Sequence, residues 1–236
     1  MTQKDDVIKA LRGNGGMATL SQLYALTDIS QWKTKTPYAS IRRIVQTNEE
    51  FFRIQPGLWG LVAQQKEILE KMHILDNGIV QDNECTHAYY QGIVVEIGNA
   101  RGFETYIPPQ DKNRLFVHQK LSDIASLQIM HTFSYQHIVA KAKYVDIIWF
   151  NERKMPYAFF EVEHSTDFRN SLNKFFELQD FRAKFVIIAK RERFGQFQKI
   201  IGDSIYRPIQ NLVSFADYES IVKQYEKETM RYEMGI

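Results

Sequence analysis

The sequence has few of the residues on which several classes of protein depend. Its 236 residues include one cysteine, Cys85, which excludes an internal disulfide framework and a cysteine-rich zinc site. It has no apolar run of about eighteen residues that would span a bilayer, and its N-terminal segment, MTQKDDVIKALRGNGG, has no apolar core typical of a secretory signal. A glycine-rich phosphate loop is also missing. We therefore expect a cytoplasmic protein with no membrane partner and no nucleotide cofactor.

The positive and negative charges of the chain nearly cancel. Lys and Arg number 30 and Asp and Glu 28, so the formal net charge is +2. Residues 1–62 are the basic part, with eight Lys and Arg against five Asp and Glu. An acidic polymer would therefore be bound by local basic surface rather than by the charge of the whole chain. The hydrophobic fraction of 44% is enough to form a buried core.

Residues 1–62 have the pattern of a winged helix-turn-helix domain. Apolar spacing predicts three helices and then a hairpin, over residues 5–11, 20–26, 37–47 and 51–61. Thr19 introduces the second helix. The hydroxyl of Thr36 is expected to cap the third helix, and Pro37 suits its first turn. Three helices followed by a hairpin are typical of a winged helix that binds DNA.

The third predicted helix carries the candidate contacts to DNA. Its apolar stripe leaves Arg42, Arg43 and Gln46 largely on the opposite surface. In a helix-turn-helix domain this helix enters the major groove, where arginine pairs with guanine edges while other basic residues bind phosphates. We expect base contacts from Ser40, Arg42, Arg43 and Gln46, and phosphate contacts from Lys33 and Lys35. The alternative is that these residues are only solvated helix charges.

A resemblance supports the assignment of this front domain. Residues 7–61, above all the motif IQPGLWGL at residues 54–61, resemble the winged-helix module called HARE-HTH. That module occurs in DNA-associated proteins, including some restriction endonucleases. The resemblance covers about a quarter of the chain and implies that double-stranded DNA is a partner.

Residues 63–86 are predicted to be a helical linker to a second domain, residues 87–236. The expected segments are a helix over residues 63–75, a polar break at residues 76–78 and 81–84, a helix over residues 87–100 and a strand over residues 104–108. The helix over residues 87–100 buries one face, and Glu96 lies beside that face.

Two apolar runs, residues 144–150 and 157–163, are separated by a polar six-residue turn and predict a β-hairpin. If Phe150 pairs with Tyr157, Asp146 stands opposite Glu161, where paired Cβ atoms lie about 4.5–5.5 Å apart. Glu163 lies two residues further along the same face. The other face is expected to be apolar and comprises Val145, Ile147, Trp149, Ala158, Phe160 and Val162.

Carboxylates that oppose one another in a covered sheet repel, so a compensating charge is required. A divalent cation provides it, because Mg²⁺ binds one or two carboxylates together with phosphate oxygens. The competing interpretation is that the acids pair with Lys141, Lys143 or Arg169, or lie at exposed strand ends. We favour the metal site. Alternation places His164 on the other face, where we expect a hydrogen-bonded structural residue.

Asp146 followed by Glu161-Val162-Glu163 resembles the signature of the PD-(D/E)XK nuclease superfamily, which has the restriction-endonuclease-like fold. The later pattern agrees: a helix over residues 170–181, a strand over 184–189, a helix over 194–201 and a strand over 212–215. The resemblance implies an α/β fold with a mixed sheet flanked by helices. It also implies that Asp146 and Glu161 are the metal ligands.

Glu163 occupies the position of the usual lysine of this family. That lysine helps to orient the attacking water and stabilises developing negative charge, although some restriction endonucleases of this fold use Glu-x-Glu. We expect Glu163 to accept a proton from the water or to complete the metal shell. Lys174 in the following helix is a candidate source of positive charge. Glu96 resembles the extra acidic residue that many members supply from the preceding helix, or else it is a solvated glutamate.

These expectations combine into Mg²⁺-dependent hydrolysis of DNA phosphodiester bonds. The resemblance implies a type II restriction endonuclease. A homodimer is expected, because cleavage of both strands needs two centres and palindromic sites mirror two-fold symmetry. Two alternatives stay open. One is a DNA-binding regulator or partner protein with an inactive nuclease fold, and the other is a repair or junction nuclease that selects DNA structure instead of sequence.

Overall fold

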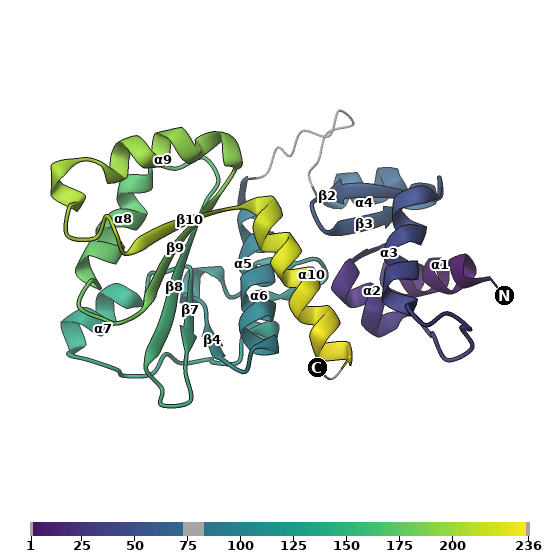
Figure 1. Cartoon of the computed structure of the whole chain (residues 1–236), viewed down its shortest axis with the longest axis horizontal. Helices are drawn as coiled ribbons and strands as arrows, with labels where there is room; N and C mark the ends of the chain where they lie inside the picture. The colour runs from purple at the N-terminus through teal and green to yellow at the C-terminus, as the bar shows by residue number, and fades with distance from the viewer. Residues whose placement is uncertain (1, 73–82, 235–236) are drawn as a thin grey trace. The chain divides into compact units, whose positions relative to one another are not determined.

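The computed structural model describes residues 2–72 and 83–234 (Figure 1). The chain forms two compact units, Met1–Asp82 with Val222–Ile236, and Asn83–Ile221. The polar break predicted at residues 76–78 and 81–84 lies outside the described residues, apart from Asn83 and Glu84, which begin a helix. Among the described residues, none of the helices is long and apolar enough to cross a membrane.

The first unit has a small antiparallel sheet with strand order β1-β3-β2. Its elements in chain order are α1 (Gln3–Gly13), β1 (Met17–Thr19), α2 (Leu20–Leu26), α3 (Pro37–Thr47), β2 (Phe51–Gln55), β3 (Leu58–Leu61) and α4 (Gln65–Lys71). Apolar residues of α1, α2 and α3 pack with those of the sheet into one core. Gly57 turns the β2–β3 hairpin with a φ of 80°, a conformation that favours glycine.

Side-chain capping explains the starts of α1 and α2 in this unit. The Thr19 hydroxyl accepts a hydrogen bond from the backbone N–H of Gln22 at 3.1 Å, and α2 spans the predicted residues. α3 also spans the predicted residues, but the expected cap is wrong, because the Thr36 side chain makes no capping hydrogen bond. Thr36 has a ψ of 65°, outside the extended conformation typical of an N-cap. Pro37 therefore starts this helix without that cap.

The later part of α10 (Tyr218–Met234) belongs to the first unit. The Tyr225 hydroxyl lies 3.2 Å from the hydroxyl of Thr19, although the two residues are 206 positions apart in the chain. Met230 packs against the core of the unit. Glu226 forms an ion pair with Arg42 of α3 at 3.0 Å. The first unit thus takes some of its packing from residues at the far end of the sequence.

The second unit is built on a five-stranded mixed sheet in the order β10-β9-β8-β7-β4. Its elements in chain order are α5 (Asn83–Ala100), β4 (Glu104–Tyr106), β5 (Leu115–Phe116), β6 (Gln119–Lys120), α6 (Leu121–Ile124), α7 (Gln136–Ala142), β7 (Ile147–Phe150), β8 (Pro156–Glu163), α8 (Phe168–Glu177), β9 (Lys184–Ala189), α9 (Phe194–Ile201) and β10 (Val213–Asp217). α7, α8 and α9 cover one face of the sheet, and α5 covers the other (Figure 1). This arrangement confirms the expected α/β fold with a mixed sheet flanked by helices.

Most predicted bounds in this unit hold to within a few residues. β9 and α9 span the predicted residues, whereas α8 begins two residues earlier and ends four residues earlier than residues 170–181. The early start follows from Asp167, whose side chain accepts a hydrogen bond from Arg169 N at 3.0 Å and caps the helix. The strand expected over residues 104–108 ends at Tyr106, because Pro108 leads into a short 3₁₀ turn.

The β7–β8 hairpin has the predicted register over most of its length. Ile147 pairs with Phe160, Ile148 with Phe159 and Trp149 with Ala158. The pairing of Phe150 with Tyr157 is wrong, because an irregularity shifts Phe150 onto Pro156. β7 also begins at Ile147 rather than at residue 144, so alternation does not extend to Val145. Val145 instead packs in the cluster that contains Ile148 and Phe159.

Both faces of the sheet are buried, which fixes the position of the hairpin. On one face, Phe159 stacks against Phe185 of β9 with ring centroids 5.4 Å apart. On the other face, the indole N–H of Trp149 donates a hydrogen bond to the Val94 carbonyl of α5 at 3.2 Å. α5 can lie this close because Gly98 has no side chain, since a Cβ there would stand 2.6 Å from the Trp149 nitrogen.

We expect Phe159→Ala to lower the free energy of unfolding by about 3–5 kcal/mol, because it leaves a cavity in a closely packed core. Phe159 is fully buried in β8, whereas the side chain of Ile129 is 83% exposed. Ile129→Ala is the matched control and should change the unfolding free energy by about 0.5 kcal/mol or less. Urea denaturation of the three proteins tests this, and a Phe159→Ala loss as small as that of the control would contradict the packing described above.

Candidate active site

Three carboxylates lie at one end of the β7–β8 hairpin and line one cavity of about 300 Å³. Asp146 stands immediately before β7, and Glu161 and Glu163 lie in β8. Their exposed fractions are 7%, 3% and 4%. Asp146 is held in place by the backbone N–H of Val162, which donates a hydrogen bond to its Oδ2 at 2.8 Å. The fully paired part of the hairpin thus ends where the acidic cluster begins.

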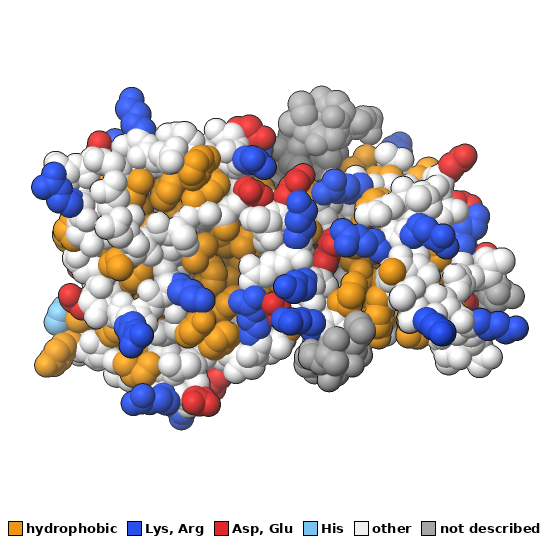
Figure 2. All heavy atoms as spheres, viewed as in Figure 1, with side chains coloured by type: hydrophobic (Ala, Val, Ile, Leu, Met, Phe, Trp, Pro, Cys, Tyr) orange, Lys and Arg blue, Asp and Glu red, His pale blue; other side chains and the backbone are white. Residues whose placement is uncertain are grey.

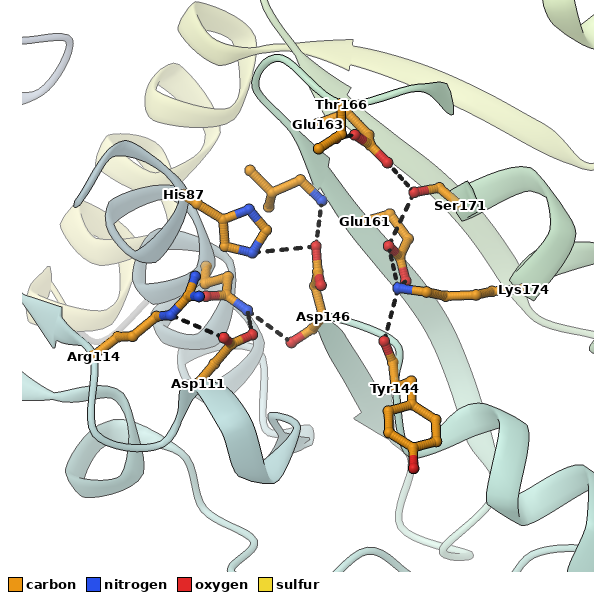
Figure 3. Close-up of polar contacts among 12 residues, drawn as sticks. His87, Asp111, Arg114, Tyr144, Asp146, Glu161, Glu163, Thr166, Ser171 and Lys174 are labelled. Atoms are coloured by element: carbon orange, nitrogen blue, oxygen red, sulfur yellow. Dashed lines mark hydrogen bonds and ion pairs between the residues drawn. The ribbon is translucent and has the colours of Figure 1, made fainter. Parts of the chain in front are cut away.

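α8 supplies Ser171 and Lys174, which contact Glu161 and Glu163 (Figure 3). The Lys174 ammonium lies 2.8 Å from both carboxylate oxygens of Glu161 and also donates to the carbonyl of Tyr144 at 2.8 Å. The Ser171 hydroxyl lies 3.0 Å from Glu161 Oε2 and also contacts Glu163. Ser171 and Lys174 are three residues apart, so they share one face of the helix. That spacing is the signal by which the sequence could have revealed Ser171.

Glu163 is contacted by Thr166 in the loop after β8, by Ser171 in α8 and by Arg193. The hydroxyls of Thr166 and Ser171 each contact one of its carboxylate oxygens. Arg193 donates to the Glu163 carbonyl at 2.9 Å and to the Thr166 carbonyl at 2.5 Å. The guanidinium also lies over the Phe168 ring at 4.2 Å. Arg193 therefore fixes the backbone that leads from β8 into α8.

The protonation of the cluster is shifted by burial. Burial raises the pKa of Asp146, and the attraction of His87 and Lys174 opposes this change. Burial and the charge of Asp146 hold the pKa of Glu161 well above its ordinary value. Burial likewise raises the pKa of Glu163 to about 7. Although burial lowers the pKa of Lys174, its attraction to Glu161 and Asp146 is larger in total, so the pKa is raised.

Another group of polar side chains lies on the α5 side of Asp146. His87 Nε2 lies 3.4 Å from Asp146 Oδ2. Gln91, one turn further along α5, donates a hydrogen bond to Asp111 at 2.8 Å, and Arg114 Nε forms an ion pair with the same carboxylate at 3.0 Å. Sequence reasoning missed this group. His87 and Gln91 share a helix face, but Asp111 and Arg114 lie in a connection without a periodic pattern.

The donor atoms fit a hard divalent cation. Asp146, Glu161 and Glu163 direct carboxylates to the same cavity, and such oxygens are the ligands that Mg²⁺ prefers. Ligand atoms of His87, Asp111 and Asp146 also lie within 4.8 Å of one another. Glu161 is outside this second group, and both of its oxygens contact Lys174.

Several sequence expectations for this region need correction. Glu96 is half-buried and is not among the cavity-lining residues; it lies nine residues after His87, about 13 Å further along α5. The competing interpretation, in which basic residues such as Lys141 and Arg169 pair with the acids, does not hold for these two, because Lys141 pairs with Glu177 and Arg169 with Asp167 and Asp203. The acids do not lie at exposed strand ends.

His164 lies at the cavity, against the expectation from alternation, because β8 ends at Glu163. Its Nδ1 lies 3.3 Å from the hydroxyl of Tyr218, which agrees with the expected hydrogen-bonded role. Burial lowers the pKa of His164, and the nearby charges of Lys190 and Arg193 act in the same direction.

The candidate DNA contacts of the first unit differ in their surroundings. Arg43, Gln46, Lys33 and Lys35 are exposed. Arg42 is half-buried and paired with Glu226, and the Ser40 hydroxyl donates to the Thr36 carbonyl at 3.1 Å. Basic and acidic side chains are interspersed on the visible face of the molecule (Figure 2).

We expect the metal-free protein to lose stability as pH rises from about 4.5 to 7. The pKa of Glu163 is raised to about 7 in the folded chain, so the folded state binds more protons in this window and its stability falls as they are released. Glu163 alone accounts for about 3 kcal/mol at most. Urea denaturation in a chelator at pH 5 and pH 8 measures the change, and Glu163→Gln should reduce it. An equal change in both proteins would contradict the assignment.

Comparison with known proteins identifies the family. The family model described as the type II restriction enzyme NmeDI C-terminal domain matches residues 69–234. The type II restriction enzyme NmeDI of Neisseria meningitidis serogroup C is 30% identical over 123 residues, which cover 47% of this chain and 34% of the relative. The chain thus matches about a third of the length of that curated relative. No solved structure matches the chain. Because the family model covers well over half of the sequence, the chain belongs to the NmeDI C-terminal domain family of type II restriction enzymes.

Proposed function

We propose that the protein is a type II restriction endonuclease that hydrolyses phosphodiester bonds of double-stranded DNA at a specific sequence and depends on Mg²⁺. One observation carries the proposal: Asp146, Glu161 and Glu163 are buried together in a cavity that Lys174 also lines. Membership of a type II restriction enzyme family supports it, as does the similarity to an enzyme named for that activity.

We assign the second unit to the PD-(D/E)XK fold. The assignment is supported by the antiparallel β7–β8 hairpin and by β9, which pairs parallel to β8 after the crossover helix α8. Asp146 and Glu161 take the positions of the acids that hold the metal in that superfamily. Glu163 takes the position of its lysine.

Asp146 and Glu161 would hold Mg²⁺, because both carboxylates line the cavity and a nearby cation favours their charged forms. When bound, the ion polarises the phosphate and lowers the pKa of a water molecule. The backbone N–H of Val162 keeps Asp146 oriented toward Glu161, so the two acids stay in position. Both oxygens of Glu161 contact Lys174, so the ion would have to take one of them from the lysine.

Glu163 would take a proton from the attacking water. A carboxylate with a pKa near the working pH is an efficient general base, and burial raises the pKa of Glu163 to about 7. The hydroxyls of Ser171 and Thr166 hold its two oxygens in one orientation. Glu163 can alternatively complete the metal shell.

Lys174 would supply the positive charge that the family lysine supplies from the strand. Its ammonium reaches Glu161 from α8, so the charge enters the same cavity from a different element. A fixed cation beside the reacting phosphate stabilises negative charge that develops in the transition state.

We further propose that the first unit is a winged helix-turn-helix, with α3 as the recognition helix and β2–β3 as the wing. The order of its elements supports this assignment. The exposed Arg43 and Gln46 would contact base edges, and Lys33 and Lys35 would contact phosphates. Arg42 must leave Glu226 before it can join them.

We also propose that two copies of the chain act together as a homodimer, because cleavage of both strands of a palindromic site requires two centres. A dimer would convert supercoiled plasmid to linear product with little nicked intermediate.

We expect the wild-type protein to cut plasmid and phage DNA into discrete fragments in Mg²⁺ and to be inactive in a chelator. Asp146→Asn should reduce the cleavage rate about 1,000-fold, because it removes a metal ligand. Lys174→Met should reduce it about 100-fold. Gel analysis of timed digests measures these rates, and sequencing of the fragment ends gives the cut site.

Asp180→Asn is the matched control, since Asp180 is exposed in the turn after α8 and should leave the rate unchanged. Purified wild-type protein that cuts no DNA in Mg²⁺ or Mn²⁺ would favour the inactive DNA-binding regulator or partner protein. Cleavage confined to flaps or junctions would favour the repair nuclease.

We expect Arg43→Ala to weaken binding of a duplex that carries the mapped site about 10-fold or more, because it removes a contact to a base edge. Fluorescence anisotropy in Ca²⁺ in place of Mg²⁺ measures the Kd without cleavage. Arg12→Ala is the control, because Arg12 is an exposed arginine of α1 in the same unit. An equal effect of the two variants, or a loss that is the same for duplexes without the site, would count against base recognition by α3.

A further inference from the structure

Arg114 lines the same cavity as the three acids but comes from the α5 side of Asp146 (Figure 3). We propose that Arg114 binds a non-bridging oxygen of the DNA phosphodiester at this site, and that Asp111 and Gln91 are positioning residues for Arg114. This assignment differs from one in which Asp111 is a metal ligand together with His87 and Asp146. The assignment of Arg114 to the phosphodiester rests on the proposed nuclease function.

The two oxygens of Asp111 are already bonded. Arg114 Nε forms an ion pair with Oδ1 at 3.0 Å, and Gln91 Nε2 donates a hydrogen bond to Oδ2 at 2.8 Å. Asp111 is 3% exposed, so Arg114 and Gln91, rather than water, stabilise its carboxylate. A cation bound by Asp111 would have to displace one donor and would lie beside the guanidinium. The geometry therefore suits a carboxylate that orients an arginine better than one that binds an ion.

The backbone around Arg114 is fixed before any ligand binds. The Arg114 N–H donates to the Asp111 carbonyl at 2.9 Å, and the Arg114 carbonyl accepts a hydrogen bond from Leu121 N at 2.9 Å. The following strand, β5, is anchored by Phe116, which is fully buried against Gly92 of α5. A Cβ at Gly92 would lie 2.3 Å from the Phe116 ring, so this contact needs glycine. An arginine held in this way loses little conformational entropy when it binds.

The charge distribution of the cavity favours a positive side chain on the α5 side, in addition to the proposed Mg²⁺ and Lys174. A phosphodiester is an anion, and Asp146, Glu161 and Glu163 repel it unless positive charge is close. Lys174 lies against Glu161, on the far side of Asp146 from Arg114 (Figure 3). Arg114 is paired with Asp111, and one Asp111 oxygen lies within 4.8 Å of an Asp146 oxygen, so the guanidinium stands close to a proposed metal ligand. A guanidinium also matches the geometry of phosphate oxygens.

The test measures the Kd of a duplex that carries a cleavage site mapped with wild-type protein, by anisotropy in Ca²⁺ at several salt concentrations. We expect Arg114→Ala to raise the Kd about 10- to 100-fold and to reduce the slope of log K against log salt by about 0.9, the value for one lost phosphate contact. Arg114→Lys should restore the slope but only part of the affinity. Arg153→Ala is the control, because Arg153 is exposed in the β7–β8 turn.

Asp111→Asn separates the two roles of Asp111. If Asp111 positions Arg114, the variant raises the Kd for DNA while Mn²⁺ binding, measured by calorimetry without DNA, stays at the wild-type value. A tenfold or larger loss of Mn²⁺ affinity would overturn the proposal in favour of a metal ligand. An unchanged salt slope in a folded Arg114→Ala protein, checked by its thermal melting, would also overturn it. Failure of the wild-type protein to bind or cut DNA would instead overturn the proposed function.

Discussion

Repulsion between buried negative charges is the constraint around which the second unit is organised. Asp146, Glu161 and Glu163 would push the end of the hairpin apart if their environment offered no positive charge or hydrogen-bond donors. The three side chains are almost fully buried, so water contributes little to this compensation. The donors come instead from the segment that directly follows β8, where the loop contributes Thr166 and α8 contributes Ser171 and Lys174. The same helix that completes the parallel crossover thus makes the acidic cluster tolerable.

The sequence predicted those features that depend on local periodicity. Alternation in two apolar runs gave the β7–β8 register through Ile147–Phe160, and that register is what gathers the acids. Helical spacing and capping residues gave α2 and α3. The predictions failed where regular structure ends. An irregularity after Trp149 pairs Phe150 with Pro156, and the backbone of Thr36 leaves the conformation in which its side chain could cap α3.

Residues that reach the cavity from distant segments could not be predicted in this way. His87, Asp111 and Arg114 approach Asp146 because α5 and β5 pack together through Phe116 and Gly92, and such a contact leaves no periodic trace in the sequence. Lys174 was found because it belongs to the helix next to the hairpin. The cavity residues that belong to one supersecondary motif could therefore be predicted from the sequence. Those that tertiary packing brings to the cavity could not.

The contribution of α10 to the first unit has a consequence for the order of events during synthesis. Tyr225 and Met230 leave the ribosome long after Leu61, the last residue of β3. At about 5–20 residues per second, the delay is on the order of 10–30 seconds. During that time the surface that α10 later covers is exposed on the nascent chain. The unit proposed to hold DNA thus reaches its final packing only after the five-stranded sheet of the second unit has been translated.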